Sequence, residues 1–138
     1  NSAENLITTI TSEWKSFKAF VKDASEKKMA YFIWRKPWMV AGNNTFIDFL
    51  LKENRFINAF GEKARYPEVL LSELKMMEDL DYILLSSEPF PFKQKHIDEI
   101  HRELPSVKII LVDGEYFSWY GSRLQNAFKY FESLHKKI

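Results

Sequence analysis

Three segments of the chain share one pattern that constrains the fold: a run of β-branched, aliphatic and aromatic residues ends in a cluster of aromatic, charged and turn-forming residues. The runs are residues 30–34, 82–85 and 107–112, and the clusters follow at 35–38, 86–92 and 113–120. Short apolar runs of this kind are typical of buried parallel strands. In open α/β sheets, ligands bind at the carboxyl ends of the strands, where the loops converge. We therefore expect the functional site at that edge of the sheet.

The residues between the runs predict the helices that would cover such a sheet. Apolar residues three and four apart in residues 3–24 predict a first helix about 30 Å long, more than a crossover between short strands needs. Asn44 or Thr45 is placed to cap the next helix, and Ser72 a later one. The other predicted elements are helices at 46–54, 71–77, 93–104 and 121–136 and a short strand or extended turn at 56–61. This order predicts an α/β fold with a mostly parallel, Rossmann-like sheet flanked by helices and preceded by a long helix.

Composition narrows the classes of function. A chain of 138 residues has room for one core, and a net charge of +1 without a long basic block argues against a nucleic-acid partner. The absence of cysteine excludes disulfides, thiolate metal ligands and a cysteine nucleophile. The apolar runs are shorter than the roughly 20 residues of a membrane span. The chain opens without a start methionine or a signal sequence, so we expect it to be processed, trimmed or a fragment.

The motifs of common catalytic sites are missing from the sequence. The four glycines do not have the spacing of a phosphate-binding loop, and Ser86 and Ser87 lack the flanking glycines of a nucleophile elbow. His96 and His101 are five residues apart, which places them on different faces of the predicted helix, and His135 lies in a charged tail. We expect all three histidines to be solvated surface residues rather than metal ligands.

Three carboxylates lie at predicted strand ends, and two interpretations of them stay open. Glu88, Asp113 and Glu115 are placed to act as an acid–base pair or a Mg²⁺ cluster in an α/β enzyme or regulatory domain. Alternatively, Asp113 and Gly114 form a turn and Glu115 faces water. Neither interpretation specifies a reaction.

Aromatic residues make up 16% of the chain and gather after the predicted strands. From the residues alone we expect Trp34 and Phe117 to lie in the core, but one edge of a small sheet cannot hide all of these rings. With the basic Arg35 and Arg123 and the acidic Glu88 nearby, they indicate a surface that stacks on a large, partly apolar, charged ligand. The rings are Trp34, Trp38, Phe90, Phe92, Tyr116, Phe117, Trp119 and Tyr120.

The loop sequences resemble the C-terminal lobe of the helical-backbone substrate-binding proteins, which serve ATP-binding-cassette importers of cobalamin, ferric siderophores and related metal chelates. The segments that carry the resemblance are YFIWRKPWM at 31–39, GNNTFI at 42–47, ARYPEV at 64–69, LLSSEPFPF at 84–92 and DGEYFSWYGSR at 113–123. The resemblance implies two α/β lobes joined by a stiff helix, with the chelate in the cleft between them. Residues 1–28 would then be the end of the interlobe helix and a linker, and 29–138 the C-terminal lobe. The N-terminal lobe would be a missing part of the same protein.

The resemblance also implies roles for individual residues. Arg35 and Arg123 would bind carboxylate or phosphate groups of the chelate. The family docks on its permease through an acidic residue of each lobe; Ser118 stands at the expected position here, which leaves Glu88 or Glu115 as the docking carboxylate. The metal would arrive inside its chelate, so neither a cofactor nor a protein ligand to metal is implied. The implied ligand-binding residues are Trp34, Arg35, Trp38, Phe90, Tyr116, Phe117, Trp119, Tyr120 and Arg123.

The function implied by the resemblance is that of a receptor rather than an enzyme. It would be periplasmic or otherwise extracytoplasmic, with or without a lipid anchor, and its partners would be the chelate and the permease subunits. The enzyme or regulatory domain with a carboxylate cluster stays open as the alternative. We also expect an isolated lobe to self-associate through the aromatic surface that its partner lobe would cover.

Overall fold

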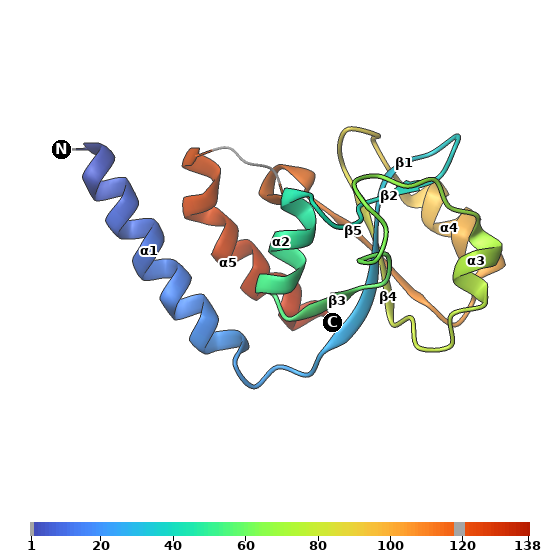
Figure 1. Cartoon of the computed structure of the whole chain (residues 1–138), viewed down its shortest axis with the longest axis horizontal. Helices are drawn as coiled ribbons and strands as arrows, with labels where there is room; N and C mark the ends of the chain where they lie inside the picture. The colour runs from blue at the N-terminus through green and yellow to red at the C-terminus, as the bar shows by residue number, and fades with distance from the viewer. Residues whose placement is uncertain (1, 118–120) are drawn as a thin grey trace.

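One five-stranded sheet organises the molecule in this computed structural model, which describes residues 2–117 and 121–138 (Figure 1). Its strands are β1 (Lys27–Trp34), β2 (Met39–Val40), β3 (Phe56–Asn58), β4 (Tyr82–Ser86) and β5 (Lys108–Val112). β4 pairs in parallel with both β1 and β5, so these three strands end at the same edge of the sheet. β1 also pairs with β3 in parallel and with β2 in antiparallel orientation. The predicted α/β fold with a mostly parallel sheet is confirmed.

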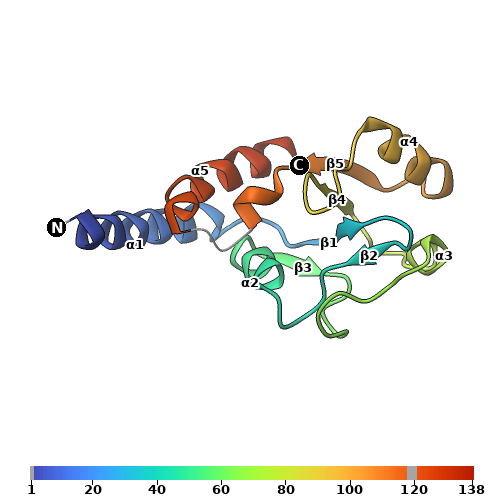
Figure 2. The same cartoon turned by 90° about the horizontal axis from the view of Figure 1, so that it is seen from above.

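Helices cover both faces of the sheet (Figures 1 and 2). On one face lie α1 (Ser2–Val21), α2 (Phe46–Glu53) and α5 (Gly121–Lys137), and on the other α3 (Leu71–Lys75) and α4 (Gln94–Glu103). A short 3₁₀ helix, η1 (Gly114–Phe117), connects β5 to α5. None of the helices that the structure describes combines the length and the apolar character that crossing a bilayer requires.

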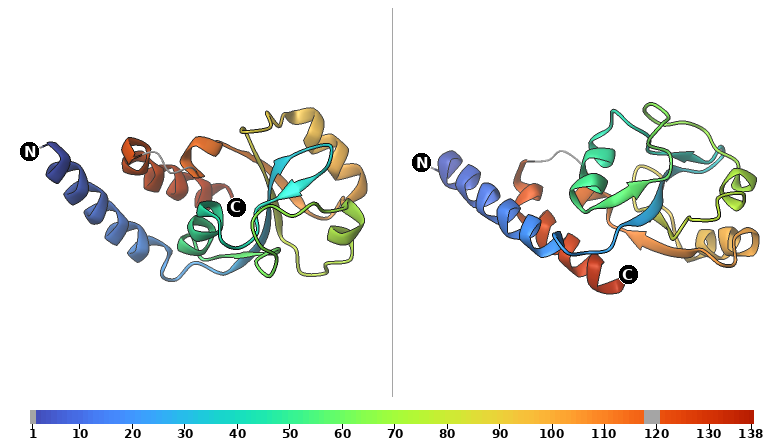
Figure 3. Two further views of the ribbon diagram at one scale, coloured as in Figure 1. Left: turned by 45° about the horizontal axis from the view of Figure 1, so that its top comes forward. Right: turned by 60° about the horizontal axis from the view of Figure 1, so that its bottom comes forward.

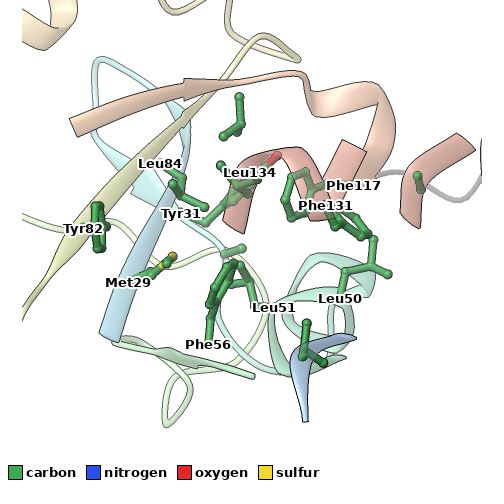
Figure 4. Packing of buried hydrophobic residues seen from close by; sticks show 14 of the residues in the cluster. Met29, Tyr31, Leu50, Leu51, Phe56, Tyr82, Leu84, Phe117, Phe131 and Leu134 are labelled. Carbon is green, nitrogen blue, oxygen red and sulfur yellow. The ribbon is translucent and has the colours of Figure 1, made fainter. Parts of the chain in front are cut away.

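The two faces of β1 contribute to two separate hydrophobic clusters, because side chains alternate along a strand. Met29, Tyr31 and Ile33 belong to the cluster under α1, α2 and α5, whereas Ala30 and Phe32 belong to the cluster under α3 and α4. Figure 4 shows the first cluster, in which side chains of the strands meet those of the helices. Burial of each large apolar side chain contributes roughly 1.5–3 kcal/mol, so both clusters hold the sheet between its helices.

The long first helix packs along α5, on the outside of its layer (Figures 1 and 3). Phe17 of α1 is fully buried, with ring centroids 5.6 Å from Phe128 and 5.9 Å from Phe131 of α5. The predicted helix at 3–24 is thus present, but it ends at Val21.

Two local features differ from the sequence predictions. After β1 the chain turns back and β2 pairs with Phe32 and Trp34, a strand of two residues that is too short to show any periodicity. Ser72 does not cap α3, because that helix begins at Leu71 and the Glu73 carboxylate accepts a hydrogen bond from the Leu70 N–H (3.0 Å).

Of the two residues placed to cap α2, Thr45 is the cap. Its Oγ1 accepts a hydrogen bond from the Asp48 N–H at 3.0 Å. Asn44 precedes it in the left-handed conformation (φ 60°), which asparagine tolerates better than most residues. The cap fixes the start of α2 and therefore the position of Phe46 and Ile47, the first two residues of the helix.

Candidate functional site

A hollow of about 600 Å³ opens at the carboxyl edge of the sheet, on the side covered by α2 and α5. We call it the cleft hollow. This is the edge at which the strand pattern places a functional site. Its lining comes from β1, from the loops that follow β4 and β5, from α2 and from the loop before α3. The lining residues are Tyr31, Ile33, Phe46, Ile47, Tyr66, Ser86, Glu88, Pro89, Gly114 and Phe117.

A chain of hydrogen bonds forms the floor of the cleft hollow. The Tyr31 hydroxyl donates to Ser86 Oγ (3.1 Å), and Ser86 Oγ donates to the Glu88 carbonyl oxygen (2.6 Å). Complete burial raises the pKa of Tyr31 above its ordinary value, and the hydrogen bond that Tyr31 donates to Ser86 opposes this only in part. Tyr31 therefore stays a neutral phenol, and the proton of Ser86 is held by a carbonyl oxygen.

Gly114 allows the loop after β5 to lie directly against the loop after β4. A Cβ at this position would overlap Ser86 Oγ and lie 2.7 Å from Glu88 Cγ. The Gly114 N–H also donates to Ser87 Oγ at 2.9 Å, which joins the two loops. The close approach of a backbone to neighbouring side chains is a common reason for glycine at a position.

The walls of the cleft hollow are mostly apolar and aromatic. Phe117 is 2% exposed, and its ring centroid lies 4.9 Å from Tyr31 and 5.1 Å from Phe131, as Figure 4 illustrates. Tyr66 is 42% exposed and Phe46 is half-buried. Glu88 is the one charged side chain among the described residues that line the hollow. The arrangement suits a ligand with flat or apolar surfaces.

The other two carboxylates take up different positions. Asp113 Oδ1 accepts a hydrogen bond from the Glu115 N–H at 3.0 Å, which is the turn expected in one of the two interpretations. The Asp113 N–H in turn donates to the Tyr130 hydroxyl at 2.7 Å. Glu115 is half-buried rather than fully exposed to water. Within residues 2–117 and the described side chains of α5, no three His, Asp or Glu residues gather in a way that could hold a metal ion.

Arg35 lies away from the cleft hollow and is paired with α4. Its Nε donates to Glu99 Oε1 at 2.7 Å, Nη2 pairs with Glu99 Oε2, and the guanidinium lies 5.1 Å from the ring centroid of Trp38. The bonds to Glu99 raise the pKa of Arg35, and the same bonds lower the pKa of Glu99. Arg35 and Phe90 line a second hollow of about 510 Å³, on the α4 side of the same edge. We call it the basic hollow.

The remaining predicted aromatic residues have different environments. Phe117 lies in the core as expected from the residues alone, but Trp34 is 39% exposed, with its ring centroid 5.5 Å from that of Phe90. The expectation of a core position for Trp34 was wrong: it is the last residue of β1, where the buried run of the strand has ended. Tyr116 stacks on Tyr130 at 4.5 Å. Trp38 is half-buried between Phe32 and Phe92.

Three predicted positions lie outside the described part of the chain. They are Trp119, Tyr120 and the side chain of Arg123. Ser118, where the resemblance places a docking residue, lies outside it as well. The proposed roles of these residues stay predictions.

Two of the three histidines are less exposed than expected: His96 is buried and His135 is half-buried. His96 is 6% exposed; its Nδ1 accepts a hydrogen bond from the Lys93 N–H (2.9 Å) and its ring packs on Phe90 and Phe92. His135 packs on Phe56 (4.9 Å between centroids) at the α1–α5 layer. Burial lowers the pKa of both histidines. His101 alone is exposed as predicted.

Several residues of the cleft hollow were not singled out from the sequence. Tyr31 and Ile33 share one face of the first strand run, so strand alternation places them together. Tyr66 lies within the segment at 64–69 that carries the family resemblance, which was the available signal. Phe46 follows the predicted cap of α2 directly. Ser86 ends a predicted strand and lies within the segment at 84–92, which also carries the family resemblance.

The fold has counterparts among solved structures, although no protein-family model and no curated protein sequence matches the chain. A possible iron-binding periplasmic solute-binding protein of Staphylococcus epidermidis superposes with a TM-score of 0.76 at 15% identity, covering 99% of this chain and 54% of that one. The periplasmic heme-binding protein RhuT of Roseiflexus sp. RS-1 gives 0.72 at 17% identity, covering 96% and 56%. The periplasmic heme-binding protein HutB of Vibrio cholerae gives 0.71 at 18% identity, also covering 96% and 56%.

These comparisons establish the fold of the chain. It is a fold found within periplasmic solute-binding proteins, which confirms at the level of fold the resemblance read from the loops. The chain spans about half the length of the solved structures it matches.

Proposed function

We propose that this chain is one lobe of an extracytoplasmic receptor that captures a metal chelate and delivers it to the permease of an ATP-binding-cassette importer. The chelate would be cobalamin, a ferric siderophore or haem. Residues 29–138 would form the C-terminal lobe, residues 1–28 the end of the interlobe helix and a linker, and a second lobe would close over the ligand. The observation that carries the proposal is the aromatic cleft hollow at the carboxyl edge of the sheet, in a fold shared with periplasmic solute-binding proteins.

The walls of the cleft hollow favour binding over chemistry. Phe117 is held rigidly between Tyr31 and Phe131, and the more exposed Tyr66 offers a ring that a large ligand can stack on. The hydroxyl proton of Ser86 goes to the Glu88 carbonyl rather than to a base. Among the described lining residues there is thus no nucleophile paired with a base, which supports a receptor rather than an enzyme.

The position of the two candidate docking carboxylates favours one of them. Glu88 lines the cleft hollow, so a ligand and a second lobe would cover it. Glu115 belongs to η1, at the edge of the same loop cluster, and does not line the hollow. We therefore assign contact with the permease to Glu115 in this proposal.

A substitution at Tyr66 tests the proposed function. We expect Tyr66→Ala to weaken chelate binding roughly tenfold, because loss of a stacked ring costs about 0.5–1.5 kcal/mol beyond its buried area. Tyr66 is 42% exposed, so the variant should fold normally. The measurement is calorimetric titration of the longer protein from which this lobe would come, with cyanocobalamin, haemin and a panel of ferric siderophores.

The matched control is Met76→Ala, which removes an apolar side chain that is 82% exposed and lies outside the cleft hollow. It should bind the chelate like the parent protein. The proposed function would be contradicted by a protein that binds no chelate of the panel. If the Tyr66 variant and the parent bind the chelate with equal affinity, the ligand binds outside the cleft hollow.

A further inference from the structure

The basic hollow concentrates positive charge in a chain that is nearly neutral. Arg35 and Lys36, from the turn after β1, and Lys95 and Arg102, from α4, face Glu99 as the one acidic residue of the described lining. The whole chain has a formal net charge of +1. Glu99 is already committed to Arg35 through two hydrogen bonds. The other three cations form no salt bridge with a described residue, although the charge of Arg102 also acts on Glu99.

A histidine ring also lines the basic hollow. His96 is 6% exposed, and its Nδ1 accepts the Lys93 N–H, which places the proton of the neutral ring on Nε2. Burial, followed by the charge of Lys95, lowers the pKa of His96, so the ring is neutral at neutral pH. No hydrogen bond from Nε2 to another described residue is present, and Nε2 is not among the fully buried side-chain atoms without a partner. An acceptor in the hollow can therefore reach this N–H.

The fixed guanidinium gives the basic hollow a rigid wall. Arg35 is held from one side by Glu99 and lies against the Trp38 ring on another. Such an arginine presents its remaining N–H groups without a large loss of side-chain entropy. Lys36, Lys95 and Arg102 are exposed and can approach an anion from the rim. Several donors around one small space suit a group with several acceptor oxygens and more than one negative charge.

We infer that the basic hollow is a binding site for a phosphate group, separate from the cleft hollow. The two hollows share no lining residue and lie on opposite sides of the sheet at its carboxyl edge. The phosphate is either free inorganic phosphate or the headgroup of an anionic phospholipid. The inference does not depend on the proposed chelate-binding function, because the residues of the basic hollow, from the β1–β2 turn, the loop after β4 and α4, do not line the cleft hollow.

Titration of the chain with inorganic phosphate, followed by ¹⁵N–¹H NMR, tests this site. Chloride holds the ionic strength constant, since screening alone weakens exposed charges. We expect saturable shifts for the amides of Lys36 and Lys95 and for the His96 ring. Lys95→Gln and Arg102→Gln should each weaken binding about fivefold, as expected for one exposed ionic contact. Lys129→Gln, which removes an exposed lysine of α5, should change nothing.

A second arm identifies the source of the phosphate. Flotation with vesicles of phosphatidylcholine, with and without phosphatidylglycerol, should show binding to the anionic vesicles that Arg102→Gln reduces if the ligand is a headgroup. Phosphate binding without vesicle binding supports the soluble ligand. The inference would be overturned by two results obtained together. The first is that chloride reproduces the phosphate shifts, or that Lys95→Gln and Arg102→Gln both leave them unchanged; the second is that the chain does not float with anionic vesicles.

Discussion

Gly114 occupies a place where only a hydrogen atom fits between two loops of the candidate site. Its absent Cβ would overlap Ser86 Oγ and crowd Glu88. We expect Gly114→Ala to lower the free energy of unfolding by about 1–3 kcal/mol, the usual cost of overpacking a tight site. Urea unfolding measures the change. Gly61→Ala is the comparison: a Cβ there would lie 3.2 Å from the Asn58 carbonyl oxygen, so a smaller loss is expected. Equal losses would argue against the tight loop contact.

The environment of a residue could be predicted from the sequence where it depends on the residues close to it in the chain. The core position of Phe117 was expected from its apolar ring in the loop after a predicted strand, and Thr45 as a cap follows from its local chemistry. Trp34 is the last residue of β1 and Arg35 follows it, and there the side-chain direction depends on the turn into β2 and on Glu99 of a distant helix. A single sequence contains no signal for those tertiary contacts.

His135 couples the packing of α5 on its neighbours to pH. The ring packs on Phe56, and Nε2 lies 3.2 Å from Asn54 Oδ1. Burial, and then the charge of Lys27, lowers the pKa of His135 below its ordinary value of 6.5. Between the lowered and the ordinary pKa, the unfolded chain binds more protons than the folded chain. The free energy of unfolding contributed by His135 is therefore present above that window and is lost as pH falls through it.

We expect urea unfolding to show lower stability at about pH 5.5 than at about pH 7.5, with a smaller difference in His135→Gln. Glutamine keeps an N–H that can reach Asn54 but does not titrate. His101→Gln, at an exposed position, should retain the full difference. His96, whose pKa burial also lowers, accounts for the part that remains in the His135 variant. An unchanged pH dependence in His135→Gln would contradict this assignment.

Most helices and strands were predicted from the sequence, including the short β3 and α3, whereas the two-residue β2 and the 3₁₀ helix η1 were not. The strands β4 and β5 and the helices α2 and α4 lie within a few residues of their predicted ranges. β2 has only two residues and exists because it pairs with β1. His96 and Ile100 are four residues apart on α4 and are both buried, so the helix period contained the signal for a buried histidine.

At the scale of the whole molecule, the open aromatic surface predicts self-association of the isolated chain. Tyr66 and Trp34 are 42% and 39% exposed at the edge of the sheet that a second lobe would cover. Exposed apolar patches of this kind promote contact between copies. Sedimentation velocity should show dimers at high concentration, and fewer of them in a Tyr66→Ala, Trp34→Ala double variant. A purely monomeric profile at all concentrations would argue against self-association through this aromatic surface.

The central claim is that the cleft hollow binds a metal chelate. NMR titration of this chain with diamagnetic chelates tests it most directly, because the method detects the weak binding expected of half a cleft. Suitable probes are cyanocobalamin, gallium siderophores and zinc protoporphyrin. We expect one of them to shift the amides of Phe46, Ser87 and Gly114, around the cleft hollow. Shifts confined to α4, or no saturable shift with any chelate, would contradict it.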